Sequence, residues 1–282
     1  MGRCGGLDPP SWLSPIMRGT LCEMKRHPFF QFSGAAAGLC VAAGMLWSQN
    51  AGNQPTAGNP PSAPLPAQSM SATELAAIPI VPPRTGKSVK KAIFDGRTLN
   101  GWDGNSELWS VDRGEIVGRS TGRAASTFLF TKDNYTDFRL TFSSKMVDSE
   151  NHAGIGFWGT VVPDAENPTN KWAIHGPLIA FPVPAMWDYI LNKFLRVLYK
   201  TNQTVTSQNE WNKVEILARG NRVRCAFNGV ETMEWREADP SRIVAGPIGI
   251  QLHGWNGSQE ARYKDIVVET FPKEDKLLTV KP

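Results

Sequence analysis

Three histidines are the side chains of this 282-residue chain best suited to acid–base chemistry: His152, His175 and His253. Each is out of phase with its apolar neighbours, so each is predicted to point away from the core, and Gln251 shares the face of His253. Imidazoles exchange protons near neutral pH and also bind divalent metals. If the three converge, they could act as bases or acids, or hold a divalent metal with one position open for substrate. The alternative is three unrelated, partly exposed histidines.

Tryptophan and amide side chains in the same regions favour a carbohydrate as the ligand. Flat indole rings can stack on sugar rings while polar groups take the hydroxyls. The candidate substrate-binding residues are Asn151, Trp158, Trp172, Gln251 and Trp255. For any one of these tryptophans, simple core packing is the competing interpretation.

Several other function classes lack support in the sequence. It contains no HExxH, CxxC, GxSxG or phosphate-loop motif, and no carboxylate pair typical of glycosidases can be identified. The net charge is +4 without a basic stripe, so no nucleic-acid partner is expected. Of four cysteines, only Cys225 lies outside the first 40 residues, and its position in an alternating apolar run predicts a buried thiol.

The elements that would position these side chains are strands. Between residues 210 and 269, apolar residues recur with a period of two, and the pair Asn228-Gly229 separates two such runs. Because Asn-Gly favours a two-residue hairpin turn, these runs predict a meander of three strands, with two further strands following. Similar runs upstream complete the prediction of an all-β fold, a two-sheet antiparallel sandwich.

Two upstream segments are less regular. The strand from His152 to Trp158 carries Gly154 and Gly156 on the face of His152, which weakens a sheet unless something approaches the backbone closely. Residues 161–206 are rich in proline and aromatic residues, and a short helix is expected near Met186–Leu191.

The N-terminal part of the chain has the composition of an export signal followed by a tether. Residues 1–23 are interpreted as an upstream extension, 24–51 as a signal peptide or N-terminal anchor, and 52–88 as a disordered, proline-rich linker. We therefore expect an exported protein, periplasmic or extracellular, with a membrane tether as the alternative to cleavage. The folded domain is expected at 89–272 and a C-terminal tail at 273–282.

Seven short motifs in order resemble a known family. They are Phe94-Asp-Gly-Arg-Thr-Leu-Asn-Gly-Trp102, Trp109-x-Val-x-x-Gly-x-Ile116, Thr131-x-x-x-Tyr-x-Asp-Phe138, Ala153-Gly-Ile155, Glu210-Trp-Asn212, Phe227-Asn-Gly229 and Gly249-Ile-Gln-Leu-His253. This series is similar to the 3-keto-disaccharide hydrolase domain. The resemblance implies a concanavalin A-like jelly roll that cleaves 3-keto-glycosides by hydrolysis, or by elimination and hydration, in some members with a metal. The chain departs from the family pattern at Trp158, where an Arg is frequent, and at Trp172-Ala-Ile-His175, which lacks the family's acid.

Two functions from different classes remain open at this point. In the first, a ketone at C3 acidifies the C2 proton, His152 or His253 removes it, and His175 serves as acid or metal ligand. Gln251 and Asn151 would then donate to the hydroxyls or to the enediolate. In the second, the same sandwich and tryptophans form a non-catalytic carbohydrate-binding module.

Overall fold

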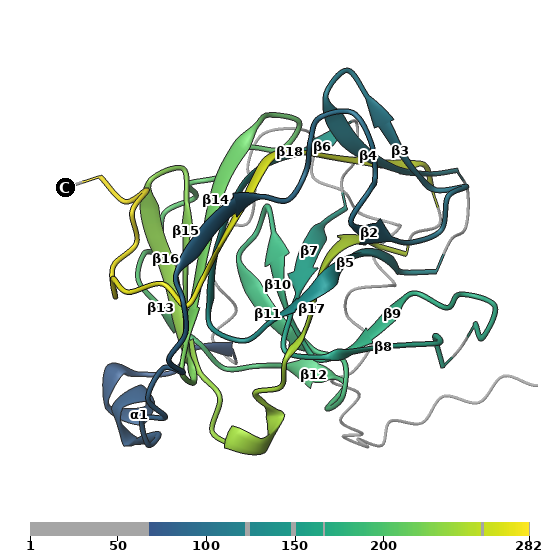
Figure 1. Ribbon diagram of the computed structural model, residues 1–282. Coiled ribbons are helices and arrows are strands. Elements are labelled where there is room, and N and C mark those ends of the chain that lie inside the picture. Colours follow the sequence, from purple (N-terminus) through teal and green to yellow (C-terminus); the bar gives the residue numbers. More distant parts are fainter. Residues whose placement is uncertain (1–67, 122–124, 148–150, 166, 255–256, 282) are drawn as a thin grey trace, which may run out of the picture. The chain divides into compact units, whose positions relative to one another are not determined.

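The computed structural model describes residues 68–121, 125–147, 151–165, 167–254 and 257–281, and these form two large antiparallel sheets packed face to face (Figure 1). The predicted all-β, two-sheet jelly-roll sandwich is confirmed. The expectations for residues 1–67 lie outside the described residues. No helix in the described ranges combines the length and apolar character needed to cross a membrane.

The larger sheet has nine strands in the order β13-β16-β15-β14-β6-β18-β4-β3, with β1 also paired to β18. Their bounds are β1 Val89–Ala92, β3 Trp109–Asp112, β4 Glu115–Ser120, β6 Phe138–Val147, β13 Leu198–Tyr199, β14 Asn212–Arg219, β15 Arg222–Phe227, β16 Val230–Arg236 and β18 Gln259–Thr270. The predicted meander is β14, β15 and β16, which lie side by side in Figure 1. Asn228 and Gly229 form its second turn with φ of 49° and 86°, as the Asn-Gly pair predicts.

The smaller sheet has seven strands in the order β12-β11-β10-β7-β17-β5-β2. Their bounds are β2 Trp102–Asp103, β5 Thr127–Tyr135, β7 Ala153–Gly156, β10 Pro177–Phe181, β11 Ala185–Asp188, β12 Lys193–Phe194 and β17 Gly246–Leu252. A separate hairpin joins β8 Thr160–Val162 to β9 Ala173–His175. The expected helix near Met186–Leu191 is wrong: Met186 pairs with Ile179 in β10, and the Asp188 carboxylate accepts the Ile190 and Leu191 N–H groups to form a turn.

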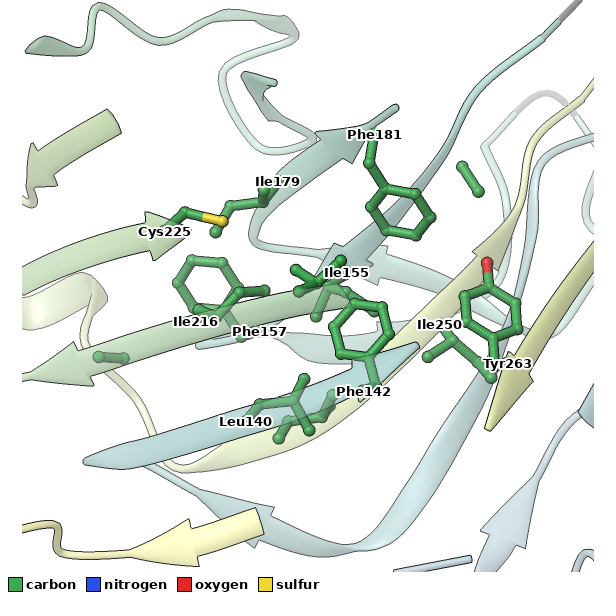
Figure 2. Close-up of a cluster of buried hydrophobic side chains, with 14 of the residues drawn as sticks. Leu140, Phe142, Ile155, Phe157, Ile179, Phe181, Ile216, Cys225, Ile250 and Tyr263 are labelled. Atoms are coloured by element: carbon green, nitrogen blue, oxygen red, sulfur yellow. The ribbon is translucent and has the colours of Figure 1, made fainter. Parts of the chain in front are cut away.

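The main core lies between the two sheets. Leu140 and Phe142 of the larger sheet face Ile155 and Phe181 of the smaller one, and the Phe142 and Phe181 ring centroids are 5.9 Å apart (Figure 2). Cys225 is fully buried in this core, as its place in the alternating run predicts, and burial raises its thiol pKa. Burying apolar surface at about 25 cal/mol per Å² is the main driving force for a fold of this kind.

The linker expected over residues 52–88 is wrong for its described part. Ser71 caps the helix α1 Ala72–Ala77 through a capping box with Glu74, and the chain then lies along the larger sheet. Asn221, in the turn between β14 and β15, donates to Pro79 O at 2.9 Å and accepts from Val81 N at 3.0 Å. These hydrogen bonds satisfy the backbone of a segment that its composition alone would leave unfolded.

The C-terminal segment also packs on the larger sheet. Leu277 is buried against Leu217 of β14. Glu215, which is fully buried, accepts from Leu278 N at 2.9 Å and forms an ion pair with Arg139. A charge pair with these additional hydrogen bonds has the partners it needs to be tolerated inside a protein.

Candidate functional site

The pairing of β7 with β17 brings two of the predicted histidines together. The strands run antiparallel, with Ile155 opposite Ile250, so the residue before β7 and the residue after β17 meet at the same end of the sheet. These residues are His152 and His253, whose ring centroids are 3.9 Å apart with their planes at 44°. Both rings are partly buried. Convergence of two imidazoles is therefore a property of the strand register.

Asn151 determines how His253 is hydrogen-bonded. Its Oδ1 accepts the backbone N–H of His152 at 2.9 Å, which fixes the orientation of the amide. Its Nδ2 then lies 3.0 Å from Nδ1 of His253 and can only donate. Nδ1 of a neutral His253 is thus the acceptor, and the ring proton is assigned to Nε2. Asn151, predicted from the sequence as a substrate-binding residue, thus contacts His253 and positions its imidazole.

Burial keeps both imidazoles neutral. Desolvation, followed by the neighbouring His253, lowers the pKa of His152 from 6.5 to about 3. Desolvation also lowers the pKa of His253 to about 4, and a hydrogen bond with the Gly254 backbone partly offsets this effect. Near neutral pH the site therefore contains two uncharged rings, which can accept a proton or donate an N–H hydrogen bond.

Gln251 adds a buried amide on the face of His253. Its side chain is fully buried, and Nε2 donates to the Tyr189 hydroxyl at 2.7 Å. Its Oε1 has no hydrogen-bond partner among the described residues. Burial raises the pKa of Tyr189 to about 12, so this phenol keeps its proton. An unsatisfied acceptor beside two imidazoles is a place where a ligand hydroxyl could bind.

The surrounding face of the smaller sheet is apolar. A second cluster of buried side chains covers it, with partly buried aromatic residues against it: Phe128, Phe130, Ile174, Leu178, Ala180, Ala185, Trp172, Trp187, Tyr189 and Phe194. The two glycines of β7 allow this packing. A Cβ on Gly154 would lie 2.6 Å from Leu178, and one on Gly156 would lie 2.7 Å from Ile174, so a close approach to the backbone does occur there.

His175 does not join the other two histidines, which corrects the predicted three-histidine site. It lies in β9, is exposed, and pairs with Thr160. The His175 carbonyl lies close to Gly159. Gly159 follows the C-terminal end of β7, whereas His152 precedes its N-terminal end. The described residues contain no group of three His, Cys, Asp or Glu able to hold a metal ion. Two imidazoles, one of them already hydrogen-bonded to Asn151, fall short of the three protein ligands of catalytic zinc sites, so the described residues do not fit such a metal.

The three predicted tryptophans have different environments. Trp158 is only 2% exposed. Its φ of 48° ends the strand alternation, so the indole turns into the core. There its Nε1 donates a hydrogen bond to Thr136 O at 2.6 Å. It therefore presents no surface to a sugar. Trp172 is partly exposed against the outer apolar cluster, and its carbonyl accepts Phe128 N at 3.0 Å. Trp255 lies outside the described residues.

Residues on other strands and loops that the sequence does not single out also support the histidine pair. Gln259 Nε2 donates to His152 O at 3.0 Å, and Gln208 Nε2 lies 3.4 Å from Asn151 O. Ser126 Oγ accepts Gly254 N at 2.9 Å, and Tyr189 reaches Gln251 from the turn after β11. Tyr189 was hidden by the expected helix over its segment. Gln259 carries no sequence signal beyond its position near a strand end.

Comparison with solved structures gives distant similarities. An inferred glycosyl hydrolase from Parabacteroides distasonis matches with a TM-score of 0.47 at 18% identity, covering 73% of this chain and 99% of that one. A carbohydrate-binding module, CBM66 from Bacillus subtilis, matches with a TM-score of 0.44 at 15% identity, covering 60% and 96%. A Bacillus licheniformis beta-glucanase matches with a TM-score of 0.44 at 12% identity, covering 67% and 100%.

The family assignment rests on the sequence profile of the folded domain. No curated protein matches the chain. The model of the 3-keto-alpha-glucoside-1,2-lyase-like domain matches residues 90–269, which is more than half of the chain and contains both members of the histidine pair. This match confirms the resemblance carried by the seven motifs. The chain therefore belongs to the family of 3-keto-alpha-glucoside-1,2-lyase-like domains, a carbohydrate-related family.

Proposed function

We propose that the domain cleaves glycosides whose sugar carries a ketone at C3, with His152 and His253 as the acid–base pair. The observation that carries this proposal is the contact of the two neutral imidazoles, at a centroid distance of 3.9 Å, beside the buried unsatisfied oxygen of Gln251. Membership of the 3-keto-alpha-glucoside-1,2-lyase-like family supports the same substrate class.

The hydrogen bonds of the pair assign the two rings different roles. Asn151 occupies Nδ1 of His253, so the proton of that ring is on Nε2 and could pass to a departing oxygen in exchange for the ring's hydrogen bond with the Gly254 backbone. His152 is then the base. Its lowered pKa makes it a weaker base than a free imidazole, but it also keeps the ring unprotonated throughout the neutral range. A weak base is sufficient because the C3 ketone makes the C2 proton of the sugar more acidic.

The proposed reaction begins at C2 of the 3-keto sugar. His152 takes the C2 proton, and the C2–H electron pair moves into the C2–C3 bond to give an enediolate. The ketone then re-forms, the electrons make a C1–C2 double bond, and the C1–O bond breaks with a proton from His253 going to the leaving oxygen. Addition of water across C1 and C2 gives the free 3-keto sugar. Gln251 Oε1 would accept a hydroxyl of the bound sugar, since it has no partner among the described residues.

A single experiment tests this reaction class. Purified domain is incubated with a 3-keto-disaccharide that carries deuterium at C2, and release of the second sugar is measured against the C2-protiated substrate. We expect slower release from the deuterated substrate and loss of deuterium to solvent. Equal cleavage of the unoxidised disaccharide, without exchange at C2, would indicate ordinary glycosidase chemistry and refute the proposal.

Non-catalytic carbohydrate binding is the second candidate. The observation favouring it is the partly exposed Trp172 and Trp187 beside the apolar outer cluster, where indole rings could stack on a sugar. Under this alternative the unoxidised and 3-keto sugars would bind with similar affinity, and neither would be turned over. Calorimetric titration with both ligands separates the two functions.

We further propose that the domain acts outside the cytoplasm. The basic segment Met24–His27, followed by an apolar run up to Trp47 and then by many prolines, supports export, with membrane anchoring of the N-terminal segment as the alternative to cleavage.

A further inference from the structure

The amide of Gln251 is closed off from solvent on the outer face of the smaller sheet. Gln251 is fully buried, yet its Oε1 has no hydrogen-bond partner among the described residues. Phe128 of β5, also fully buried, is directly opposite Gln251 in the strand register, so the two side chains share this face. A ligand hydroxyl can reach the Gln251 oxygen only if an element that covers this face moves away.

Two elements cover the face. The β8–β9 hairpin places Ile174, which is 1% exposed, in the outer apolar cluster with Phe128, and a Cβ on Gly156 would lie 2.7 Å from the Ile174 side chain. The turn after β11 places the Tyr189 ring centroid 5.9 Å from that of Phe128, and the Tyr189 hydroxyl 2.7 Å from Gln251 Nε2. Ile174 and Tyr189 together therefore shield this face from solvent.

The hairpin is the less firmly attached of the two elements. β11 pairs with both β10 and β12 inside the smaller sheet, whereas β8 and β9 form a separate two-stranded sheet (Figure 1). In the described ranges, neither β8 nor β9 pairs with a strand of the two large sheets. Elements with few backbone hydrogen bonds to their surroundings open more readily than the core, so the hairpin is the element that can move.

The hairpin begins and ends next to two adjacent glycines. Gly159 precedes β8 and Gly176 follows β9, and a Cβ on Gly176 would lie 2.9 Å from Gly159 Cα. Because both connections leave the hairpin at one place, it can pivot there without stretching either of them. Glycine adapts readily to the changes of backbone dihedral angles that a hinge requires.

The other end of the hairpin is fastened to the start of β5. Asn170 Nδ2 donates to Ser126 O at 2.7 Å, and Asn170 Oδ1 accepts from Thr127 Oγ1 at 3.1 Å. Phe128 N donates to Trp172 O at 3.0 Å. We name these hydrogen bonds the hairpin latch. They connect the hairpin to the smaller sheet through two side-chain contacts and one backbone contact.

The latch lies next to the histidine pair. Ser126 Oγ accepts Gly254 N at 2.9 Å, and Gly254 directly follows His253. We propose that the β8–β9 hairpin is a lid, which swings about its glycine ends, releases the latch to admit a sugar to Gln251, and closes again over that sugar. The identity of the ligand rests on the proposed function, whereas the opening of the hairpin does not. Closure would exclude water while the C2 proton is transferred.

Amide hydrogen exchange of the full chain measures the opening without a ligand. An open lid frees Phe128 N–H from Trp172 O, so this amide should exchange much faster than that of Ile216 in the central strand β14, which only global unfolding exposes. Thr127→Val removes one latch hydrogen bond and should speed Phe128 exchange about fivefold. Asn170→Ala removes two and should speed it about twenty-fivefold.

Ligand kinetics test whether this opening admits the sugar. Association of a 3-keto-disaccharide is followed by stopped-flow fluorescence in the His253→Ala protein, so that turnover does not consume it. Both latch variants should raise the association and dissociation rates by about the same factors as exchange, since the ligand enters and leaves through the open state. The matched control is Asn167→Ala, which should leave all these rates unchanged. Asn167 accepts from Thr169 of the same hairpin and lies outside the latch.

The results separate the lid from the proposed function. If Phe128 exchanges no faster than Ile216, the hairpin opens only when the whole protein unfolds, and the lid is refuted. If the latch variants speed exchange but not association, the sugar enters by another route, which also refutes the lid. If neither the wild type nor the His253→Ala protein binds a 3-keto sugar while exchange responds as expected, the proposed function fails and the opening of the hairpin stands.

Discussion

Protonation of the histidine pair should link the stability of this protein to pH from about 6.5 down to about 3. The unfolded chain has ordinary histidines with a pKa of 6.5, whereas the folded state lowers the pKa of His152 to about 3 and that of His253 to about 4. Above 6.5 both rings are neutral in both states. As the pH falls below 6.5, the unfolded state binds protons that the folded state does not, so stability decreases until the folded pKa values are reached.

The loss of stability at about pH 5 follows from the distance of that pH below the unfolded pKa. A pH of about 5 is about 1.5 units below the unfolded pKa, and one unit corresponds to about 1.4 kcal/mol, so each ring contributes about 2 kcal/mol at most. The two rings together give an upper limit of about 4 kcal/mol. Because both rings are partly exposed, solvent screening reduces this value, and we expect a loss of about 2 kcal/mol between about pH 8 and pH 5.

Urea unfolding at the two pH values measures this loss. The test compares the wild type with the double variant His152→Gln/His253→Gln, and His175→Gln serves as the matched control because His175 is exposed. The pH-dependent loss should shrink by about 2 kcal/mol in the double variant and remain in the control. Other titrating groups are common to all three proteins and cancel in the comparison. If the double variant loses as much stability as the wild type, the pair is not held neutral by burial and the reasoning fails.

Four further predictions concern activity, the core and the N-terminus. His253→Ala should lower kcat on a 3-keto-glycoside by about a hundredfold or more while the fold is retained, and an unchanged rate would remove His253 from the mechanism. Cys225→Ser should lower the free energy of unfolding by about 1–3 kcal/mol, and the native thiol should resist thiol reagents; rapid labelling would contradict its burial. Trp158→Phe should reduce stability by about 1–3 kcal/mol without weakening sugar binding, and the reverse pattern would place this indole in the site. The exported chain should begin beyond Trp47; an intact mass from the native host that retains residues 1–23 would reject this interpretation.

The local sequence determined the strands, the hairpin turns and the inward faces. Alternation along β14 and β15 predicted the burial of Cys225, and Asn228-Gly229 predicted the turn after it, because both signals depend on residues close together in the chain. A similar alternation placed Gln251, in β17, and His253, directly after it, on one face. These predictions succeeded where the backbone remained regular.

Alternation failed where the backbone left the regular strand. Trp158 adopts a φ of 48°, so its indole enters the core although its position in the run predicts the opposite face. The turn after β11 replaces the expected helix because Asp188 binds the following N–H groups and β11 pairs with β10. Residues 68–88 become ordered only because the folded domain offers hydrogen-bond partners such as Asn221.

The site itself was decided by tertiary structure. Three histidines had suitable chemistry, but only the antiparallel pairing of β7 with β17 selects His152 and His253 and leaves His175 at the other end of the strand. Convergence depends on strand order and register across about a hundred residues, which short-range patterns do not contain. The lowered pKa values, the ring proton assigned by Asn151 and the unsatisfied oxygens of Gln251 and Gln259 all follow from that packing, since burial and hydrogen-bond partners exist only in the folded state.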